Sequence, residues 1–330
     1  MNVYEQIEAN TRRTTVILFA FPVALVVTIF LFSYLMFKTE FLKPDDFAFI
    51  SKYYAKAGAL RYAFQLTLKV CPWVFLVAFL WIAFSYYNNG AMILGLTKAQ
   101  EITFDENREL YRLVENTAIM VGVPTPKIYF IDDESMNAFA TGREPKTSSI
   151  ALTKGIVNKL NKTELQAVIA HELAHIANRD TTLMLIVVAG IGCFIFFGEF
   201  LIRAATNRGG KKGKGHALML FAGIACLIFG YIVAPILRFA LSRRREYQAD
   251  ATAAKVIHDP NAIALALSKI ASDSNVEFLN ANLLVGNICI ADPAKKGRLS
   301  FVSQLYATHP PIEDRIAALR RMMVRGKALY

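Results

Sequence analysis

Four long apolar stretches constrain this chain more than any other feature of its 330 residues. A helix that crosses the hydrocarbon core of a bilayer needs roughly 20 apolar residues. The stretches that approach or exceed this length lie at residues 15–37, 70–87, 182–202 and 217–241. They predict four transmembrane helices. We expect the first to be a retained span rather than a cleaved signal, because no small-residue cleavage pattern follows it.

The composition indicates that these spans are combined with a water-facing domain. The chain is 55% hydrophobic, which is high for a soluble protein, yet 19% of its residues are charged, which is high for spans alone. Its net charge of +11 suits contact with anionic lipid headgroups. The Lys and Arg residues are scattered without a nucleic-acid motif, so we expect the lipid bilayer as a partner and no nucleic acid.

The segments between the apolar stretches predict a globular domain that is interrupted by a membrane hairpin. Asn161 and Glu164 resemble a capping box, which marks the start of a helix. The predicted helices lie at residues 107–121, 162–177, 243–256, 261–272 and 311–325, and the predicted strands at 126–131 and 148–153. We therefore divide the chain into an N-terminal membrane region (1–87), a first domain part (88–181), a transmembrane hairpin (182–241) and a second domain part (242–330).

The clearest chemical motif is His171-Glu172-Leu173-Ala174-His175, within the helix predicted at 162–177. Residues four apart share one face of a helix, so two imidazoles can meet one metal ion, with Glu172 bordering that face. Zinc in such a site needs one more protein ligand and keeps a position for water. Zinc lowers the pKa of this water, and Glu172 is placed to take its proton as general base. We expect one zinc ion per chain.

An acidic pair downstream offers the missing ligand. Glu246 and Asp250 are also four apart on a predicted helix, so Glu246 can be the third ligand and Asp250 can accept a hydrogen bond from a ligand histidine. Alternatively, the pair only neutralises the arginines at 243–245. If Glu246 and His171 share one zinc ion, the chain between them must cross the membrane an even number of times. Two apolar stretches lie between them, as this requires. Charged residues flank the His171 motif, so we do not expect it to lie inside a membrane span, as it would in an intramembrane protease.

Four ordered motifs resemble those of the membrane-bound M48 peptidases, most closely the bacterial HtpX-type heat-shock proteases, which are related to the CAAX-prenyl endopeptidases. The motifs are Asn137-Ala138-Phe139-Ala140-Thr141-Gly142-Arg143, the His171 motif followed by Asn178-Arg179-Asp180, Arg244-Arg245-Glu246-Tyr247-Gln248-Ala249-Asp250, and Thr308-His309-Pro310-Pro311 with Arg315. The resemblance implies a mostly α membrane protein with about four transmembrane helices and an α+β zincin-like (gluzincin) catalytic domain.

The resemblance also implies roles for individual residues. Glu246 is the third zinc ligand, and Asp180 joins Asp250 in supporting the ligands from behind. His309 and Arg315 stabilise the oxyanion that develops on the substrate. Without the resemblance, His309 would be interpreted as a loop histidine.

A substrate-binding strand follows from the same resemblance. Asn137, Ala138, Phe139 and Ala140 would form the rim strand along which an extended polypeptide lies. Main-chain hydrogen bonds to such a strand hold a peptide with little demand on its sequence, which suits an endopeptidase. Asn137 would contact the substrate backbone, although it could otherwise be a turn residue.

The resemblance implies a zinc endopeptidase that cleaves misfolded or damaged membrane proteins at the bacterial inner membrane, with its active site facing the cytoplasm. The basic residues near the first and fourth spans support this orientation, whereas the lysines at 211–214 would then face outward. The alternative function is an inactive zinc-binding membrane scaffold or holdase, which has no use for the base Glu172. The segment at 38–69 is longer than a short turn, so we expect an additional helix or a lid there.

Overall fold

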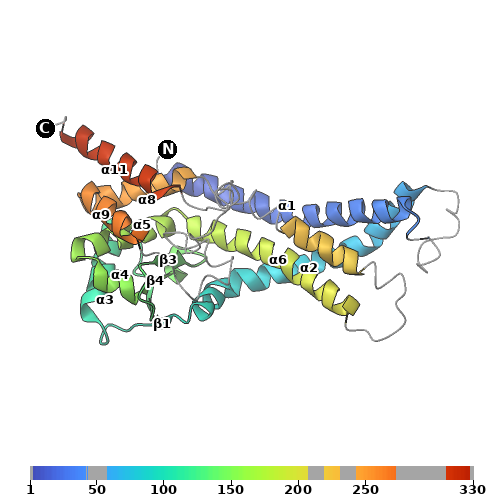
Figure 1. Ribbon diagram of the computed structural model, residues 1–330, viewed down its shortest axis with the longest axis horizontal. Coiled ribbons are helices and arrows are strands. Elements are labelled where there is room, and N and C mark those ends of the chain that lie inside the picture. Colours follow the sequence, from blue (N-terminus) through green and yellow to red (C-terminus); the bar gives the residue numbers. More distant parts are fainter. Residues whose placement is uncertain are drawn as a thin grey trace. The chain divides into compact units, whose positions relative to one another are not determined.

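Two compact units make up the part of the chain that the structure describes. The computed structural model describes residues 3–41, 43, 58–206, 219–230, 243–272 and 310–327. The sheet unit comprises Met1–Thr14, Tyr86–Leu185 and Pro235–Tyr330, and the helical unit comprises Thr15–Ser85 and Ile186–Ala234. The sheet unit thus brings together segments from both ends and the middle of the chain (Figure 1).

Four short strands form one mixed sheet in the sheet unit. Their bounds are β1 Gln100–Glu101, β2 Lys127–Ile131, β3 Ala138–Thr141 and β4 Ser149–Thr153. They lie in the order β1-β2-β4-β3. The pair β2–β4 is parallel, while β1–β2 and β3–β4 are antiparallel. Because β3 pairs only with β4 in this sheet, it forms one end of the described strand order.

The two strands predicted from the residue pattern are both present, as β2 and β4. They pair in register from Lys127 opposite Ser149 to Ile131 opposite Thr153. All residues of β4 are buried, as expected for a strand in the middle of a covered sheet. β3 corresponds to the rim strand that the family resemblance implied. β1 was not predicted, because two residues are too few to show a strand period.

Two helices of the sheet unit begin where the sequence predicts. The side chain of Asn107 caps α3 (Arg108–Val121). The predicted capping box at the start of α5 (Lys162–Ala177) is confirmed, because Asn161 and Glu164 each accept a hydrogen bond from the other's backbone N–H, both at 2.9 Å. A cap of this kind stabilises a helix by about 1 kcal/mol. The start of α5, and with it the register of its side chains, is therefore well defined.

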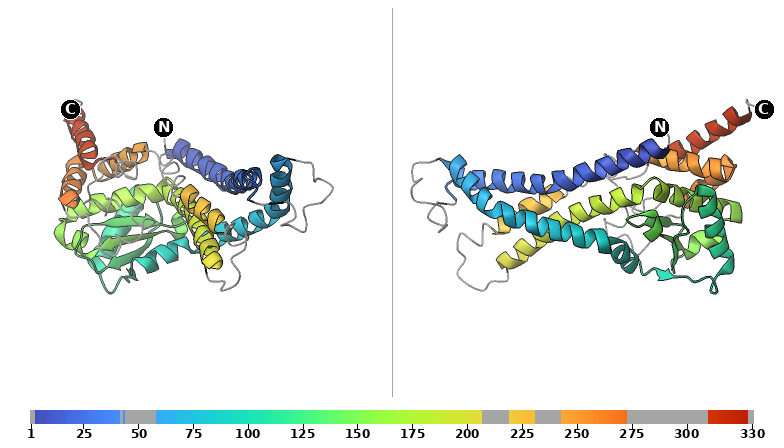
Figure 2. Two further views of the ribbon diagram at one scale, coloured as in Figure 1. Left: turned by 45° about the vertical axis from the view of Figure 1, so that its right-hand side comes forward. Right: turned by 180° about the vertical axis from the view of Figure 1, so that it is seen from behind.

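Three C-terminal helices also belong to the sheet unit and match the predicted ranges closely. They are α8 (Arg243–Val256), α9 (Pro260–Ser272) and α11 (Ile312–Lys327). α8 and α9 pack against α5, and α11 packs against α8 and α9 (Figure 2). The predicted oxyanion residue His309 lies outside the described residues.

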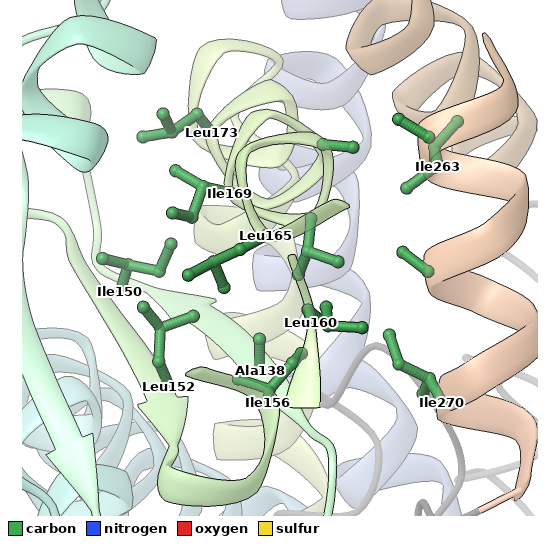
Figure 3. Packing of buried hydrophobic residues seen from close by; sticks show 14 of the residues in the cluster. Ala138, Ile150, Leu152, Ile156, Leu160, Leu165, Ile169, Leu173, Ile263 and Ile270 are labelled. Carbon is green, nitrogen blue, oxygen red and sulfur yellow. The ribbon is translucent and has the colours of Figure 1, made fainter. Parts of the chain in front are cut away.

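A continuous apolar core holds α5 between the sheet and α9. Figure 3 shows side chains of β4, α5 and α9 pointing toward one another, among them Ile150, Ile169, Leu173 and Ile263, each fully buried. Burying one such side chain contributes about 1.5–3 kcal/mol. α5 is thus held rigidly from several sides.

The helical unit contains most of three helices that are long and apolar enough to cross a membrane. They are α1 (Val3–Lys38), α2 (Ala59–Leu96) and α6 (Asp180–Thr206). On α6, Glu199 and Arg203 form an ion pair, with 3.0 Å between charged atoms. The apolar helices thus include the first three predicted spans.

A shorter apolar helix, Met219–Gly230, lies within the fourth predicted stretch at 217–241, and the rest of that stretch is outside the described residues. This helix packs closely against α6. A Cβ added at Gly198 of α6 would lie 3.0 Å from the carbonyl oxygen of Gly223. Small residues at such a contact are typical of helices that associate in a membrane.

The helix that contains the second apolar stretch is longer than the stretch itself. α2 extends beyond residues 70–87 at both ends, and its part that is long and apolar enough to cross a membrane is Ala59–Asn88. Pro72 lies inside α2, and membrane helices tolerate proline because neighbouring groups satisfy the backbone that it frees. The predicted intervening segment at 38–69 is accordingly shorter, and its residues 42 and 44–57 lie outside the described part of the chain.

Candidate metal centre

α5 carries the His171 motif on the side that faces α8. His171 and Glu172 are buried, and the side chain of His175 is 14% exposed. The Nε2 atoms of the two histidines lie 3.2 Å apart. The helical spacing therefore brings both imidazoles to one point, as predicted, with Glu172 next to His171 in the chain.

α8 brings Glu246 to the same point. Its carboxylate oxygens lie 3.7 Å from Nε2 of His171 and 3.6 Å from Nε2 of His175. Ligand atoms of these three residues all lie within 4.8 Å of one another, and within the described ranges no other group of His, Cys, Asp and Glu has this geometry. The structure thus unites the two halves of the predicted site, which are separated in sequence by α6 and the Met219–Gly230 helix.

The three side chains suit a tetrahedral metal ion. In a zinc site with bonds of about 2.0–2.1 Å, ligand atoms lie about 3.3–3.4 Å apart. The separations of 3.2 to 3.7 Å among His171, His175 and Glu246 are close to that value. Two imidazole nitrogens and one carboxylate are also a donor set that zinc accepts, with one position left for water.

A buried carboxylate lies behind His171, and a buried guanidinium lies behind that carboxylate. Nδ1 of His171 lies 3.0 Å from Oδ1 of Asp250 on α8. Arg315 of α11 donates two hydrogen bonds to Asp250, from Nε at 2.9 Å and from Nη2 at 2.7 Å. Arg315 is fully buried, and the nearest approach of its Nη1 to Glu246 is 3.8 Å. The predicted support by Asp250 is thus present in the geometry and is itself held by Arg315.

Behind His175, a second carboxylate occupies the equivalent place. Oδ2 of Asp180 lies 2.9 Å from Nδ1 of His175. Its other oxygen, Oδ1, accepts hydrogen bonds from Arg245 at 3.0 Å and from Asn10 at 2.8 Å. Asp180 was predicted in this role, whereas the contribution of Asn10 had no signal in the sequence. Arg245 belongs to the motif at 244–250, but the family resemblance implied no role for it.

These charges raise the pKa values of both histidines. Burial opposes protonation of His171, but the hydrogen bonds that its ring donates to Asp250 and Glu246 and the negative charge of Asp250 outweigh this effect and raise its pKa to about 9. Burial also opposes protonation of His175, and the charge of Glu246 with the hydrogen bond to Asp180 outweighs it. Burial alone would raise the pKa of Asp250, yet Arg315 lowers it to about 2. The centre therefore favours a positive charge at the point where the imidazoles meet.

The predicted substrate-binding residues lie at β3, away from solvent. Asn137 is 1% exposed, its side-chain oxygen accepts a hydrogen bond from the N–H of Ala138, and its own N–H donates to Thr153, both at 2.9 Å. Ala138, Phe139 and Ala140 are buried as well. β3 contacts α5, so the strand is next to the helix that carries the His171 motif.

A helix-borne pair of histidines with a glutamate between them and a third acidic ligand position defines a metallopeptidase type of centre. The family model described as Peptidase family M48 matches residues 105–323. A "Protease HtpX homolog" of Bacteroides fragilis is 36% identical over 328 residues, covering 97% of this chain and 99% of the relative. Another, of Dictyoglomus thermophilum, is 36% identical over 330 residues, covering 99% of this chain and 97% of the relative.

The chain belongs to peptidase family M48. It is a metallopeptidase and, with its apolar helices, a membrane protease that acts on polypeptides. The crystal structure of S. mikatae Ste24p matches 85% of this chain and 61% of its own, at 21% identity and a TM-score of 0.46.

Proposed function

We propose that this protein is a membrane-bound zinc endopeptidase in which His171, His175 and Glu246 hold one zinc ion. The observation that carries the proposal is the convergence of these three side chains from α5 and α8, at separations of 3.2 to 3.7 Å. When bound, zinc supplies Lewis acidity that lowers the pKa of water and polarises the scissile carbonyl. The buried carboxylates behind the histidines fix which ring nitrogen faces the metal.

Glu172 is proposed as the general base. Its carboxylate borders the ligand face of α5 and is 2% exposed, which shields it from bulk water. From this place it takes a proton from the attacking water and delivers it to the leaving amine. We propose His309 and Arg315 as oxyanion stabilisers. Arg315 binds Asp250 through Nε and Nη2, and its guanidinium also lies 3.4 Å from Nε2 of His171 and 3.8 Å from the carboxylate of Glu246, so its charge lies next to the metal centre.

The substrate is proposed to bind as an added strand along β3. Asn137 to Ala140 lie at the end of the strand order and beside α5, which supports this proposal. Because these residues are buried, the surroundings of this edge must open before a peptide can pair with it. A peptide must be extended to pair with a strand, and unfolded chains can adopt this conformation. Misfolded or damaged membrane proteins are therefore the proposed substrates.

The proposed architecture has four transmembrane helices and a gluzincin-type catalytic domain, divided at residues 1–87, 88–181, 182–241 and 242–330. The close packing of Gly198 against Gly223 supports a hairpin formed by the third and fourth spans. A hairpin returns the chain to the same side of the membrane. His171 and Glu246 must lie on the same side if they bind one metal ion. The proposed location is the bacterial inner membrane, with the active site in the cytoplasm.

An inactive zinc-binding scaffold or holdase is the alternative. It predicts metal binding without peptide hydrolysis. The buried carboxylate of Glu172 argues against it, because a purely structural site gains nothing from a base next to a ligand and pays for burying its charge.

The deciding experiment measures casein cleavage and bound zinc for the purified full chain in detergent. We expect cleavage by the unaltered protein, zinc without cleavage in Glu172→Gln, and loss of zinc in Glu246→Ala. Glu109→Gln, on the exposed surface of α3, is the control and should behave as the unaltered protein. Full zinc content in Glu246→Ala would refute the ligand assignment, and full cleavage by Glu172→Gln would refute the general base.

A further inference from the structure

Asn10 lies at the N-terminal end of α1, before the first predicted apolar stretch, and reaches the metal centre of the sheet unit. Its side-chain amide donates to the backbone oxygen of Asn178 and to Oδ1 of Asp180, both at 2.8 Å. The residue is only 4% exposed. Both hydrogens of the amide are therefore used, and both go to the segment that follows α5.

That segment is a tight turn between α5 and α6. Asn178 ends α5, Asp180 begins α6, and Arg179 between them has a φ of 60°. A non-glycine residue avoids this left-handed conformation unless surrounding contacts hold it. Asn10 binds the residues on both sides of Arg179, so its amide clamps the turn.

The turn sets the position of the carboxylate behind His175. A carboxylate only accepts hydrogen bonds, so Nδ1 of His175 carries the hydrogen toward Asp180 and leaves Nε2 free for a metal. Asn10 and Arg245 share the other oxygen of Asp180, which stops the carboxylate from rotating away. Without Asn10, the backbone oxygen of Asn178 and the carboxylate of Asp180 each lose a hydrogen-bond donor.

We propose that Asn10 is a positioning residue of the metal centre, acting on His175 through Asp180 and the α5–α6 turn. The inference rests on the proposed function in so far as His175 is a metal ligand. It means that the N-terminal end of the first membrane helix is part of the site's support. The peptidase segment alone, without residues 1–14, then lacks one of the groups that orient its ligands.

The first test is the metal affinity of the purified full chain, measured by chelator competition with zinc and with cobalt. Asn10→Ala should bind roughly tenfold more weakly, which is the lower end of the effect of outer partners of a ligand. Asn10→Asp should lose more, because it places a second carboxylate against Asp180. Asn116→Ala, an exposed asparagine on α3, is the matched control and should bind normally. Unchanged affinity in Asn10→Ala overturns the inference.

A double-mutant cycle separates positioning from general destabilisation. In an Asp180→Ala background, Asn10→Ala should weaken cobalt binding far less than tenfold, because its target is gone. In an Asp250→Ala background, the full roughly tenfold effect should remain. Equal effects in the two backgrounds overturn the inference, since they would mean that Asn10 acts on the fold as a whole.

The visible absorption of bound cobalt gives a second measurement at saturating metal. A changed spectrum in Asn10→Ala, with the Asn116→Ala spectrum unchanged, supports a displaced His175. Identical spectra together with unchanged affinity overturn the inference. None of these measurements requires cleavage. If the unaltered chain cleaves nothing, the proposed function fails while the binding results still decide the role of Asn10.

Discussion

The two histidines of the metal centre are supported by the same chemistry but from different parts of the chain. His171 is backed by Asp250 and Arg315 of α8 and α11, and these three side chains are essentially excluded from solvent. His175 is backed by Asp180, whose side chain is 8% exposed, and by Arg245, which is 12% exposed. One support is part of the core, while the other is assembled around a turn.

The difference indicates how each support should respond to change. A fully buried charged pair cannot be rehydrated when one partner is removed, so its loss affects the fold as well as the site. The pair of Asp180 and Arg245 is also largely buried, but its side chains are 8% and 12% exposed, so water can reach it when one partner is removed and the loss should mainly affect the orientation of the ligand. The following substitutions test this comparison.

The largest effect is expected from Arg315→Met. It leaves Asp250 buried without its cation, and breaking a buried pair costs about 3–5 kcal/mol. Denaturant unfolding of the purified chain should therefore show a loss of this size in the free energy of unfolding, together with loss of zinc. Arg320→Met, exposed on the same helix, should change neither quantity. Normal stability in Arg315→Met would remove the basis of the comparison.

Next, Asp250→Asn and Asp180→Asn compare the two carboxylates directly. Each should weaken zinc binding by about 10- to 100-fold, because an amide supports an imidazole less well than a carboxylate does. We expect Asp250→Asn at the upper end, since it also leaves Arg315 buried without an anion. Competition with a chelator measures both affinities. The opposite order would show that exposure does not decide which support matters more.

A smaller effect is expected from Arg245→Gln on the His175 side. Asp180 keeps its contacts with His175 and Asn10, so zinc affinity should fall by about tenfold or less, with little change in unfolding. The same two measurements check this. A loss of stability as large as that of Arg315→Met would mean that the His175 side is as much a part of the core as the His171 side.

The smallest effect on the site is expected from Asn161→Ala, which removes the cap at the start of α5. The free energy of unfolding should fall by about 1 kcal/mol, while zinc affinity stays unchanged. This variant calibrates the others, because it weakens the helix that carries both histidines without touching either support. A clear drop in zinc affinity here would show that destabilisation alone perturbs the site.

Local signals predicted the helices and strands of the sheet unit well. Asn161 and Glu164 marked the start of α5, and the apolar run of β4 was correctly interpreted as a strand, because both signals lie within a few residues. α2 extends beyond the apolar stretch at 70–87 at both ends, because apolar length and proline are weak signals of helix ends when lipid and neighbouring helices satisfy the backbone. The two-residue strand β1 carries no local pattern at all.

The sequence by itself determined the chemistry of this protein. The spacing of His171, Glu172 and His175 places them on one side of a helix, since an α-helix repeats every 3.6 residues whatever surrounds it. Only the tertiary structure decided which partners stand behind them. Arg315 reaches Asp250 across 65 positions, and Asn10 reaches Asp180 across 170. Contacts of that separation depend on how helices pack, and no periodicity within one segment encodes them.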